Sequence, residues 1–256
     1  MVVVATRGGL GNKLKALVSA LRLSDEVAAV YPTFSLLLEN DIPVLETIPA
    51  RCRVFSDWRF VLTPSDRLPD DFASVPIPER GDTVARVPLG RSIDLEYERV
   101  PTHLREAFLA AFAKLEIRRE IRQEVEQISG SWPGDTMAVH VRSWVESDFR
   151  RRTLFDLERF FYAVDRRGGA AALFVSSDAP EVVDEFRRRY GVRVLSPTSE
   201  ESVAHSGHTE DERVLRRAFV DMLCLARGSV LIASYLSTFS ECAWWLGGCR
   251  QEVEVV

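Results

Sequence analysis

The sequence predicts an α/β protein in which a parallel β-sheet in the carboxyl-terminal half is flanked by helices. Two patterns support this prediction: apolar strands alternate with amphipathic helices from residue 136 onwards, and the chain opens with a strand, a glycine-rich turn and a helix. The length is sufficient, because 256 residues with 46% hydrophobic side chains can bury one large core or two small ones. The change of pattern divides the chain into residues 1–130 and 131–256.

The chain opens with Met1–Ala5, an apolar run rich in β-branched residues that predicts a buried strand, and Arg7–Asn12 is the glycine-rich turn. A helix is predicted next, from apolar residues at Leu14, Leu17, Val18 and Leu21. Such a turn can cradle an anion, because glycines allow a ligand close to the backbone and N–H groups point away from the helix start. The third glycine of the dinucleotide fingerprint is missing, and a tight turn that binds nothing explains the pattern equally well.

The middle of the chain is less regular. Residues 24–100 contain eight of the twelve prolines, which predicts short strands and loops. Two apolar stripes follow, from Leu104 to Leu115 and from Ile117 to Ile128, and their shifted register fits either two helices or one kinked helix. Ser129–Gly134 then ends the helical region and marks the expected domain boundary.

The second half alternates regularly between strands and helices. Strands are predicted at residues 137–141, 171–175, 192–195, 229–233 and 253–256. Helices are predicted at residues 154–164, at 182–190, from about 209, and at 238–246. The third of these helices starts with Thr209 and Glu212, which have the spacing of a capping box. Such alternation implies helices on both faces of a parallel sheet, whose ligands bind at the carboxyl ends of the strands.

Polar residues follow three of these strands, at His140–Arg142, Ser176–Asp178 and Ser234–Thr238. Arg142 can hold a phosphate with two N–H groups, whereas the plain alternative is an ion pair at the surface. His140 shares its face of the strand, either as part of a ligand site or as a hydrogen-bonded core residue. This pattern alone favours the plain alternatives.

The other two segments have capping interpretations as well. Asp178 offers acceptors that suit the two neighbouring donors of a guanine base, but Ser177 or Asp178 can equally cap the next helix. Ser237 and Thr238 can hold a diphosphate at a helix start, or Ser237 can be an ordinary N-cap paired with Ser240.

Three further groups are weaker candidates. His205 and His208 have the spacing of a metal-binding pair but lack a third ligand. The basic run Arg150–Arg152 can enlarge a phosphate pocket, although such a run is more typical of a solvated face. Trp244 and Trp245 are expected to pack in the core rather than to stack on a sugar.

Composition limits the class of function. The net charge of −5 argues against nucleic-acid binding. The amino terminus lacks the pattern of a signal peptide, and no apolar run is long enough to predict a transmembrane helix. The cysteines lack paired spacing, which predicts reduced thiols in a cytoplasmic protein. They are Cys52, Cys224, Cys242 and Cys249.

Four segments, in order along the chain, resemble motifs of the fucosyltransferase superfamily, which spans bacterial α-1,2-fucosyltransferases, the rhizobial nodulation fucosyltransferase, and eukaryotic α-1,6- and protein O-fucosyltransferases. They are Gly8–Asn12, His140–Arg142, Ser177–Asp178 and Ser237–Ser240. The resemblance implies a GT-B-like fold of two Rossmann-like halves, of which the amino-terminal half is reduced and supplies the acceptor side. It also implies inverting, metal-independent transfer of fucose from GDP-fucose to a glycan, glycolipid or small-molecule acceptor, with no cofactor besides this donor.

The resemblance also implies roles for individual residues. Arg142 would bind the β-phosphate and stabilise the leaving group, while His140 and Asp178 would bind guanine. Two further groups would contact the donor: Ser237, Thr238 and Phe239 at the diphosphate, and Gly9, Gly11 and Asn12 beside the sugar and the pyrophosphate.

The chain departs from the superfamily pattern after Arg142, where Ser143 and Trp144 stand and many members have a second arginine. Arg151 or Arg152 would have to replace it. No carboxylate stands out as a base for the acceptor hydroxyl, and the unranked candidates are Glu46, Asp57, Asp94 and Asp148. Three alternatives therefore stay open: a transferase that uses another nucleotide sugar, a nucleotide-sugar-binding protein without catalysis, and a plain α/β domain whose motifs are caps and turns.

Overall fold

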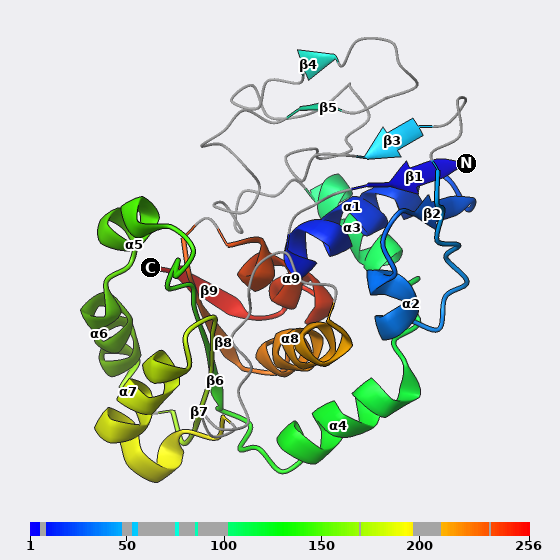
Figure 1. The fold of residues 1–256 in the computed structure, drawn as a ribbon. Helices are drawn as coiled ribbons and strands as arrows, with labels where there is room; N and C mark the ends of the chain where they lie inside the picture. Colours follow the sequence, from blue (N-terminus) through cyan, green and yellow to red (C-terminus); the bar gives the residue numbers. More distant parts are fainter. Residues whose placement is uncertain are drawn as a thin grey trace. The chain divides into compact units, whose positions relative to one another are not determined.

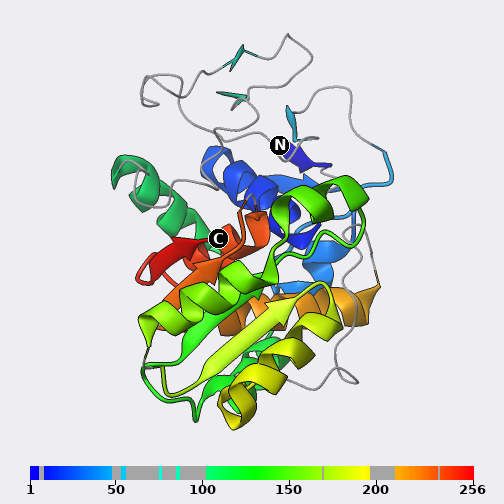
Figure 2. The same cartoon turned by 90° about the vertical axis from the view of Figure 1, so that its left-hand side faces the viewer.

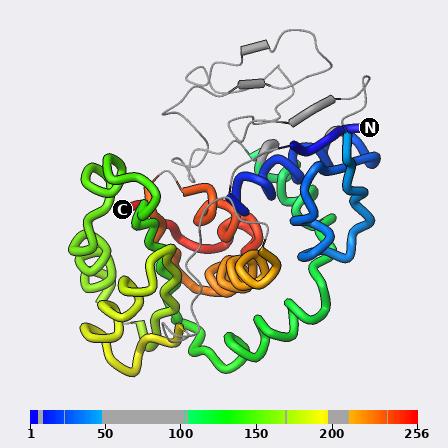
Figure 3. Tube along the Cα trace, in the orientation of Figure 1, coloured from blue at the N-terminus to red at the C-terminus, as the bar shows by residue number. Residues whose placement is uncertain are grey.

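The computed structural model describes residues 1–5, 9–47, 53–55, 75–76, 85–86, 102–168, 170–196, 211–235 and 237–256. The chain forms two compact units, Met1–Arg118 and Arg119–Val256. Figure 1 shows the elements of each unit, and Figure 3 traces the chain through them. Parallel strands occur in both units, so the α/β class predicted from the sequence is confirmed.

The first unit is built on a three-stranded parallel sheet. β1 (Val2–Val4) is its central strand, between β2 (Val27–Ala29) and β3 (Arg53–Phe55). All three valines of β1 are buried. α1 (Leu10–Leu23) connects β1 to β2, so the strand and the helix predicted at the start of the chain are confirmed. Of the predicted turn, residues 6–8 lie outside the described residues.

Several shorter elements complete the described part of this unit. They are α2 (Thr33–Leu37), β4 (Val75–Pro76), β5 (Ala85–Arg86) and α3 (Thr102–Phe112). α1 packs against β1 and α3. Its apolar stripe is buried, with Leu14, Leu17 and Val18 fully removed from solvent, so burial of this face holds the helix in place.

The second unit has a four-stranded parallel sheet in the order β7-β6-β8-β9. The strands are β6 (Met137–Val141), β7 (Leu173–Ser177), β8 (Val230–Ala233) and β9 (Glu252–Val255). The helices are α4 (Arg119–Ser129), α5 (Asp148–Leu154), α6 (Leu157–Arg167), α7 (Pro180–Tyr190), α8 (Glu212–Leu225) and α9 (Thr238–Leu246). All neighbouring strands are parallel, so each connection between consecutive strands crosses over through at least one helix.

Helices cover both faces of this sheet (Figures 1 and 2). On one face, Val139 of β6 packs with Phe161 of α6 and with Phe186 and Tyr190 of α7. Successive side chains of a strand point to opposite faces, so the even-numbered residues of β6 face α8 and α9 instead. This alternation turns His140 toward α9.

Two predictions within this unit are wrong. Residues 192–195 do not form a strand: a 3-10 helix, η3 (Gly191–Arg193), follows α7, and only Val194 bridges to Leu173. The apolar side chain of Val192 suggested a strand, but it is 97% exposed. The capping box at residue 209 is also wrong, because α8 starts at Glu212 and the Asp211 carboxylate accepts hydrogen bonds from its first turn. Thr209 itself lies outside the described residues.

The two units divide at Arg118, before α4, whereas the sequence predicted the boundary after α4, at residue 130. The two apolar stripes form separate helices, α3 and α4. α4 packs against α8, where Glu124 lies 2.9 Å from Arg216, and Glu126 lies 2.7 Å from Arg227 just after that helix. These contacts join α4 to the second unit.

Candidate functional site

The polar segments of the second unit meet where β6, β7 and β8 end. His140 lies opposite Ser176 in the strand register, and Val141 lies opposite Ser177. Just after β8, the Ser234 hydroxyl donates to the His140 carbonyl at 2.9 Å and accepts from the Arg142 amide at 2.6 Å. The predicted convergence at the carboxyl ends of the strands is therefore confirmed for these segments.

His140 connects β6 to the first turn of α9. Its Nδ1 lies 2.7 Å from the Ser240 hydroxyl oxygen and 3.4 Å from that of Ser237. Its ring stacks on Phe239 with 4.8 Å between centroids, and the residue is only 4% exposed. These contacts fit the plain alternative, a hydrogen-bonded buried histidine, and its role as a guanine ligand stays a prediction.

The start of α9 is capped as the sequence predicted. The Ser237 hydroxyl accepts a hydrogen bond from the Ser240 amide at 3.3 Å, so Ser237 is the N-cap and Thr238 and Phe239 begin the helix. The first turn of a helix presents N–H groups that favour an anion. A capping serine and an anion site are compatible, because the cap occupies only part of this first turn.

Arg142, directly after β6, is held between two carboxylates. Its Nη1 lies 2.9 Å from Asp178 Oδ2, and its Nη2 donates to the Glu146 carboxylate in a close ion pair. The two carboxylates differ in environment, since the Asp178 side chain is 3% exposed and that of Glu146 is 41% exposed. Asp178 is thus a buried ion-pair partner of the guanidinium, whereas Glu146 is a partner exposed to solvent.

Asp178 connects the end of β7 to the loop that follows β6. Its Oδ1 accepts from the Ser143 amide at 2.7 Å and from the Ser143 hydroxyl at 2.8 Å. The prediction that Ser177 or Asp178 caps the next helix is wrong: Ala179 is the N-cap of α7, without a side-chain bond. Asp178 does not cap because its carboxylate turns back to Ser143 and Arg142.

Trp144 is a site residue that the sequence interpretation missed. Its ring lies under two guanidinium groups, with 5.2 Å from the ring centre to Arg142 Cζ and 4.9 Å to Arg150 Cζ. The residue is 7% exposed and has a φ of 57°, a left-handed conformation that costs a bulky residue about 1–3 kcal/mol. The available signal was a tryptophan between a strand-end arginine and a basic run.

The basic run divides among three different partners. Arg151 lies 3.9 Å from Glu181, and Arg152 Nε donates to the Asp148 carbonyl at 3.2 Å. Arg150 is the member that reaches Trp144. The interpretation of Arg151 or Arg152 as the replacement for a second site arginine therefore gains no support from the geometry.

Gly9, Gly11 and Asn12 belong to the first unit, where Gly9 precedes α1 and the other two lie in its first turn. The next residue, Lys13, is buried and its ammonium donates to the Thr33 hydroxyl at 3.0 Å. This turn has the predicted strand-to-helix placement. Its contact with a donor stays a prediction.

The structure describes some of the weaker candidate residues from the sequence and not others. Trp244 and Trp245 are 4% and 2% exposed, so their core packing is confirmed. His205 and His208 lie outside the described residues, as do Cys52, Asp57 and Asp94. Within the described ranges, no helix is long and apolar enough to cross a membrane, and no three metal-ligating side chains gather.

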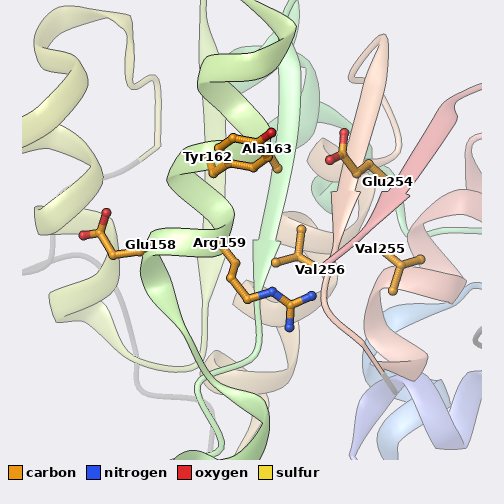
Figure 4. Close-up of a pocket in the computed structure, with 7 residues that line it drawn as sticks. All are labelled: Glu158, Arg159, Tyr162, Ala163, Glu254, Val255 and Val256. Atoms are coloured by element: carbon orange, nitrogen blue, oxygen red, sulfur yellow. The ribbon is translucent and has the colours of Figure 1, made fainter.

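A separate hollow of about 410 Å³ lies between α6 and β9. Figure 4 shows its lining, in which Arg159 and Tyr162 of α6 stand beside Glu254 and Val256 at the chain end. None of the predicted site residues lines it. We therefore place the candidate site at Arg142 rather than at this hollow.

No family model matches the sequence, and no curated protein matches it. Solved structures do. The fucosyltransferase NodZ from Bradyrhizobium matches with a TM-score of 0.55 and 18% identity, over 94% of this chain and 90% of NodZ. NodZ α-1,6-fucosyltransferase co-crystallised with GDP gives the same score and identity over 94% and 91%.

POFUT1 in complex with GDP-fucose is also similar, with a TM-score of 0.52 and 12% identity over 99% of this chain and 97% of POFUT1. At such low identity the likeness concerns the fold. It extends over nearly the whole of each chain, and it agrees with the parallel sheets and flanking helices of both units. The protein therefore has the GT-B-like α/β fold seen in these fucosyltransferase structures.

Proposed function

We propose that this protein is a glycosyltransferase that transfers fucose from GDP-fucose to a hydroxyl group of a glycan, glycolipid or small molecule. The fold supports this proposal, since similar structures were determined with GDP and with GDP-fucose. The observation that carries it is the Arg142 guanidinium, supported by buried Asp178 at the carboxyl end of the sheet. Ligands of parallel sheets bind at this end.

The chemistry that this arrangement can perform is stabilisation of a leaving diphosphate. When the bond from the sugar's anomeric carbon to GDP breaks, negative charge develops on the diphosphate and positive charge on the sugar. A guanidinium and a helix start that are already in place stabilise that negative charge without reorganising. The acceptor oxygen bonds to the opposite face of the anomeric carbon as the bond to GDP breaks, which gives inversion, and its proton passes to water or to the departing diphosphate. This step needs no metal ion.

The residue roles in this proposal follow the sequence prediction. Arg142 is the catalytic residue at the β-phosphate, and His140 and Asp178 contact guanine. In this structure Asp178 Oδ2 is buried against the Arg142 guanidinium at 2.9 Å, so a guanine contact requires that this oxygen become exposed. The diphosphate would lie along Ser237, Thr238 and Phe239. Gly9, Gly11 and Asn12 would contribute from the first unit.

A nucleotide-sugar-binding protein without catalysis is the second candidate. The observation that favours it is the departure after Arg142, where Ser143 and Trp144 stand in place of a second arginine that would stabilise the leaving phosphate. Donor binding and transfer both require that the donor displace Glu146 from Arg142. We also propose a cytoplasmic location, which the buried, unbridged thiol of Cys224 supports.

Calorimetric titration with GDP-fucose, GDP-mannose, GDP and UDP-GlcNAc tests the donor site. We expect GDP ligands to bind and Arg142→Ala to lose that binding. Arg188→Ala is the matched control, because Arg188 is a solvent-exposed arginine of the same unit that pairs with Glu185. Binding of UDP-GlcNAc alone would replace GDP-fucose by another donor. GDP-fucose binding without transfer or hydrolysis would favour the binding protein.

A further inference from the structure

Arg150 is the charged residue of the site that the proposed roles do not use. Its guanidinium carbon lies 4.9 Å from the Trp144 ring centre, and that of Arg142 lies 5.2 Å from the same centre. One buried ring thus gathers two arginines from different segments, the end of β6 and the first turns of α5. Cation–π attraction to each guanidinium favours this arrangement.

The two arginines beside the Trp144 ring differ in their carboxylate partners. Arg142 has two carboxylate partners, Asp178 and Glu146. Arg150 has no carboxylate within ion-pair distance among the described residues, and its side chain is exposed. The neighbouring Arg151 has Glu181. Arg150 therefore has its charge available to a ligand.

A diphosphate that displaces Glu146 meets an Arg142 whose charge is already matched by Asp178. The pair of Arg142 and Asp178 is close to neutral as a unit, so it offers direction and hydrogen bonds but little net attraction. A second positive charge is needed to attract the anion. Arg150 is placed to supply this charge, because its guanidinium lies against the same Trp144 ring as that of Arg142.

We propose that Arg150 is a second phosphate-binding residue of the donor site, gathered with Arg142 by Trp144, and that it contacts the β-phosphate of the nucleoside diphosphate. This proposal rests on the proposed function, which assigns Arg142 to that phosphate. Trp144 is then a positioning residue, because it acts through the two guanidinium groups. Its left-handed backbone holds the ring in the turn between Arg142 and α5, where the Ser147 amide donates to the Trp144 carbonyl.

Titration of GDP and GMP against Arg150→Ala tests the proposal, with Arg151→Ala and Arg152→Ala as matched controls. All three variants remove one positive charge from the same helix, so long-range electrostatics change equally. We expect Arg150→Ala to weaken GDP about tenfold and GMP by less than about threefold, as for loss of a charged contact to one phosphate. The controls should stay within about twofold of the wild type for both ligands.

The outcomes separate this proposal from the proposed function. Wild-type affinity of Arg150→Ala for GDP, with binding lost in Arg142→Ala, would overturn the role of Arg150 and leave the function intact. Equal weakening by all three variants would overturn it as well, because it would indicate a diffuse charge effect. A wild-type protein that binds no GDP would overturn the proposed function instead.

The positioning role of Trp144 has its own measurement. In a Trp144→Leu background, we expect Arg150→Ala to change GDP affinity by less than about twofold, because Arg150 is no longer gathered beside Arg142. An undiminished tenfold effect would show that Arg150 reaches the phosphate without the ring. Circular dichroism and urea unfolding establish that each variant is folded. Arg150 is exposed, so we expect Arg150→Ala to keep the stability of the wild type.

Discussion

Replacement of Asp178 by asparagine removes one charge and almost no volume. The carboxylate accepts two hydrogen bonds from Ser143 on one oxygen and contacts Arg142 with the other. The amide has a single acceptor oxygen, so whichever way it turns, its NH₂ group faces a donor. Asp178→Asn therefore separates the support of Arg142 from simple packing.

The expected loss of stability follows from burial. Breaking a fully buried ion pair costs about 3–5 kcal/mol, because the remaining charge has no partner. Arg142 is 19% exposed and keeps Glu146, so we expect a lower value, about 2 kcal/mol of unfolding free energy. Asp184→Asn is the control, since that carboxylate is 42% exposed and pairs with Arg187 at 3.2 Å, and we expect a change below about 1 kcal/mol.

Two ligands distinguish the two roles of Asp178. If Asp178 positions Arg142, pyrophosphate and GDP both bind about tenfold more weakly to Asp178→Asn, because the lost orientation of Arg142 outweighs the positive charge that the variant gains. Any further loss for GDP measures a guanine contact. Urea unfolding and competitive titration give both quantities. A variant with wild-type stability and wild-type pyrophosphate affinity would refute the argument that this carboxylate supports Arg142.

Other consequences of the structure can be measured directly. Glu146→Gln removes the carboxylate that competes for Arg142, so the affinity for GDP should rise about twofold to fivefold. A lower affinity for GDP than in the wild type would show instead that Glu146 aids binding. Arg142→Lys keeps the charge but loses the bidentate contact with phosphate, so the kcat of transfer should fall about 100-fold or more. A near-normal kcat would show that Arg142 takes no part in the reaction. Burial and the hydrogen bond to Asp165 raise the pKa of Tyr190 to about 12, so unfolding free energy falls as the pH rises through 10 toward that value. Tyr190→Phe should abolish this fall, about 1 kcal/mol between about pH 9 and about pH 11 in urea unfolding, and an equal fall in both proteins would contradict it.

The strands and helices with strong periodicity were predictable because burial alone determines them. β6 and α9 have the predicted bounds, because β6 is a buried apolar run and α9 begins directly after its N-cap Ser237. Residues 192–195 show where this argument fails. They carry the composition of a strand, but only Val194 reaches the edge of the sheet after the chain leaves α7 at Gly191, whose φ is 62°.

The site was predictable in its location and less so in its contacts. Residues at strand ends converge because parallel strands end at one edge, and this needs no knowledge of side chains. The partners of Asp178 depend on the path of the loop from Ser143 to Ser147, which contains a tryptophan in a left-handed conformation. Backbone conformations of this kind are not encoded in hydrophobic periodicity. Arg150 was therefore grouped with its neighbours in sequence, whereas the structure groups it with Arg142.

The two carboxylate partners of Arg142 differ in burial. This difference explains how Arg142 can be held in place by Asp178 and still bind a diphosphate. A buried carboxylate that loses its cation regains no water, so separation would leave an unpaired buried charge, and Asp178 stays with the guanidinium in the bound and unbound protein. An exposed carboxylate regains water when it leaves, so Glu146 can exchange for a phosphate at small cost. A diphosphate carries more negative charge than Glu146 and also meets Arg150, which favours the exchange. On this argument the ion pair with Glu146 belongs to the unliganded protein, and the ion pair with Asp178 to every step of the reaction.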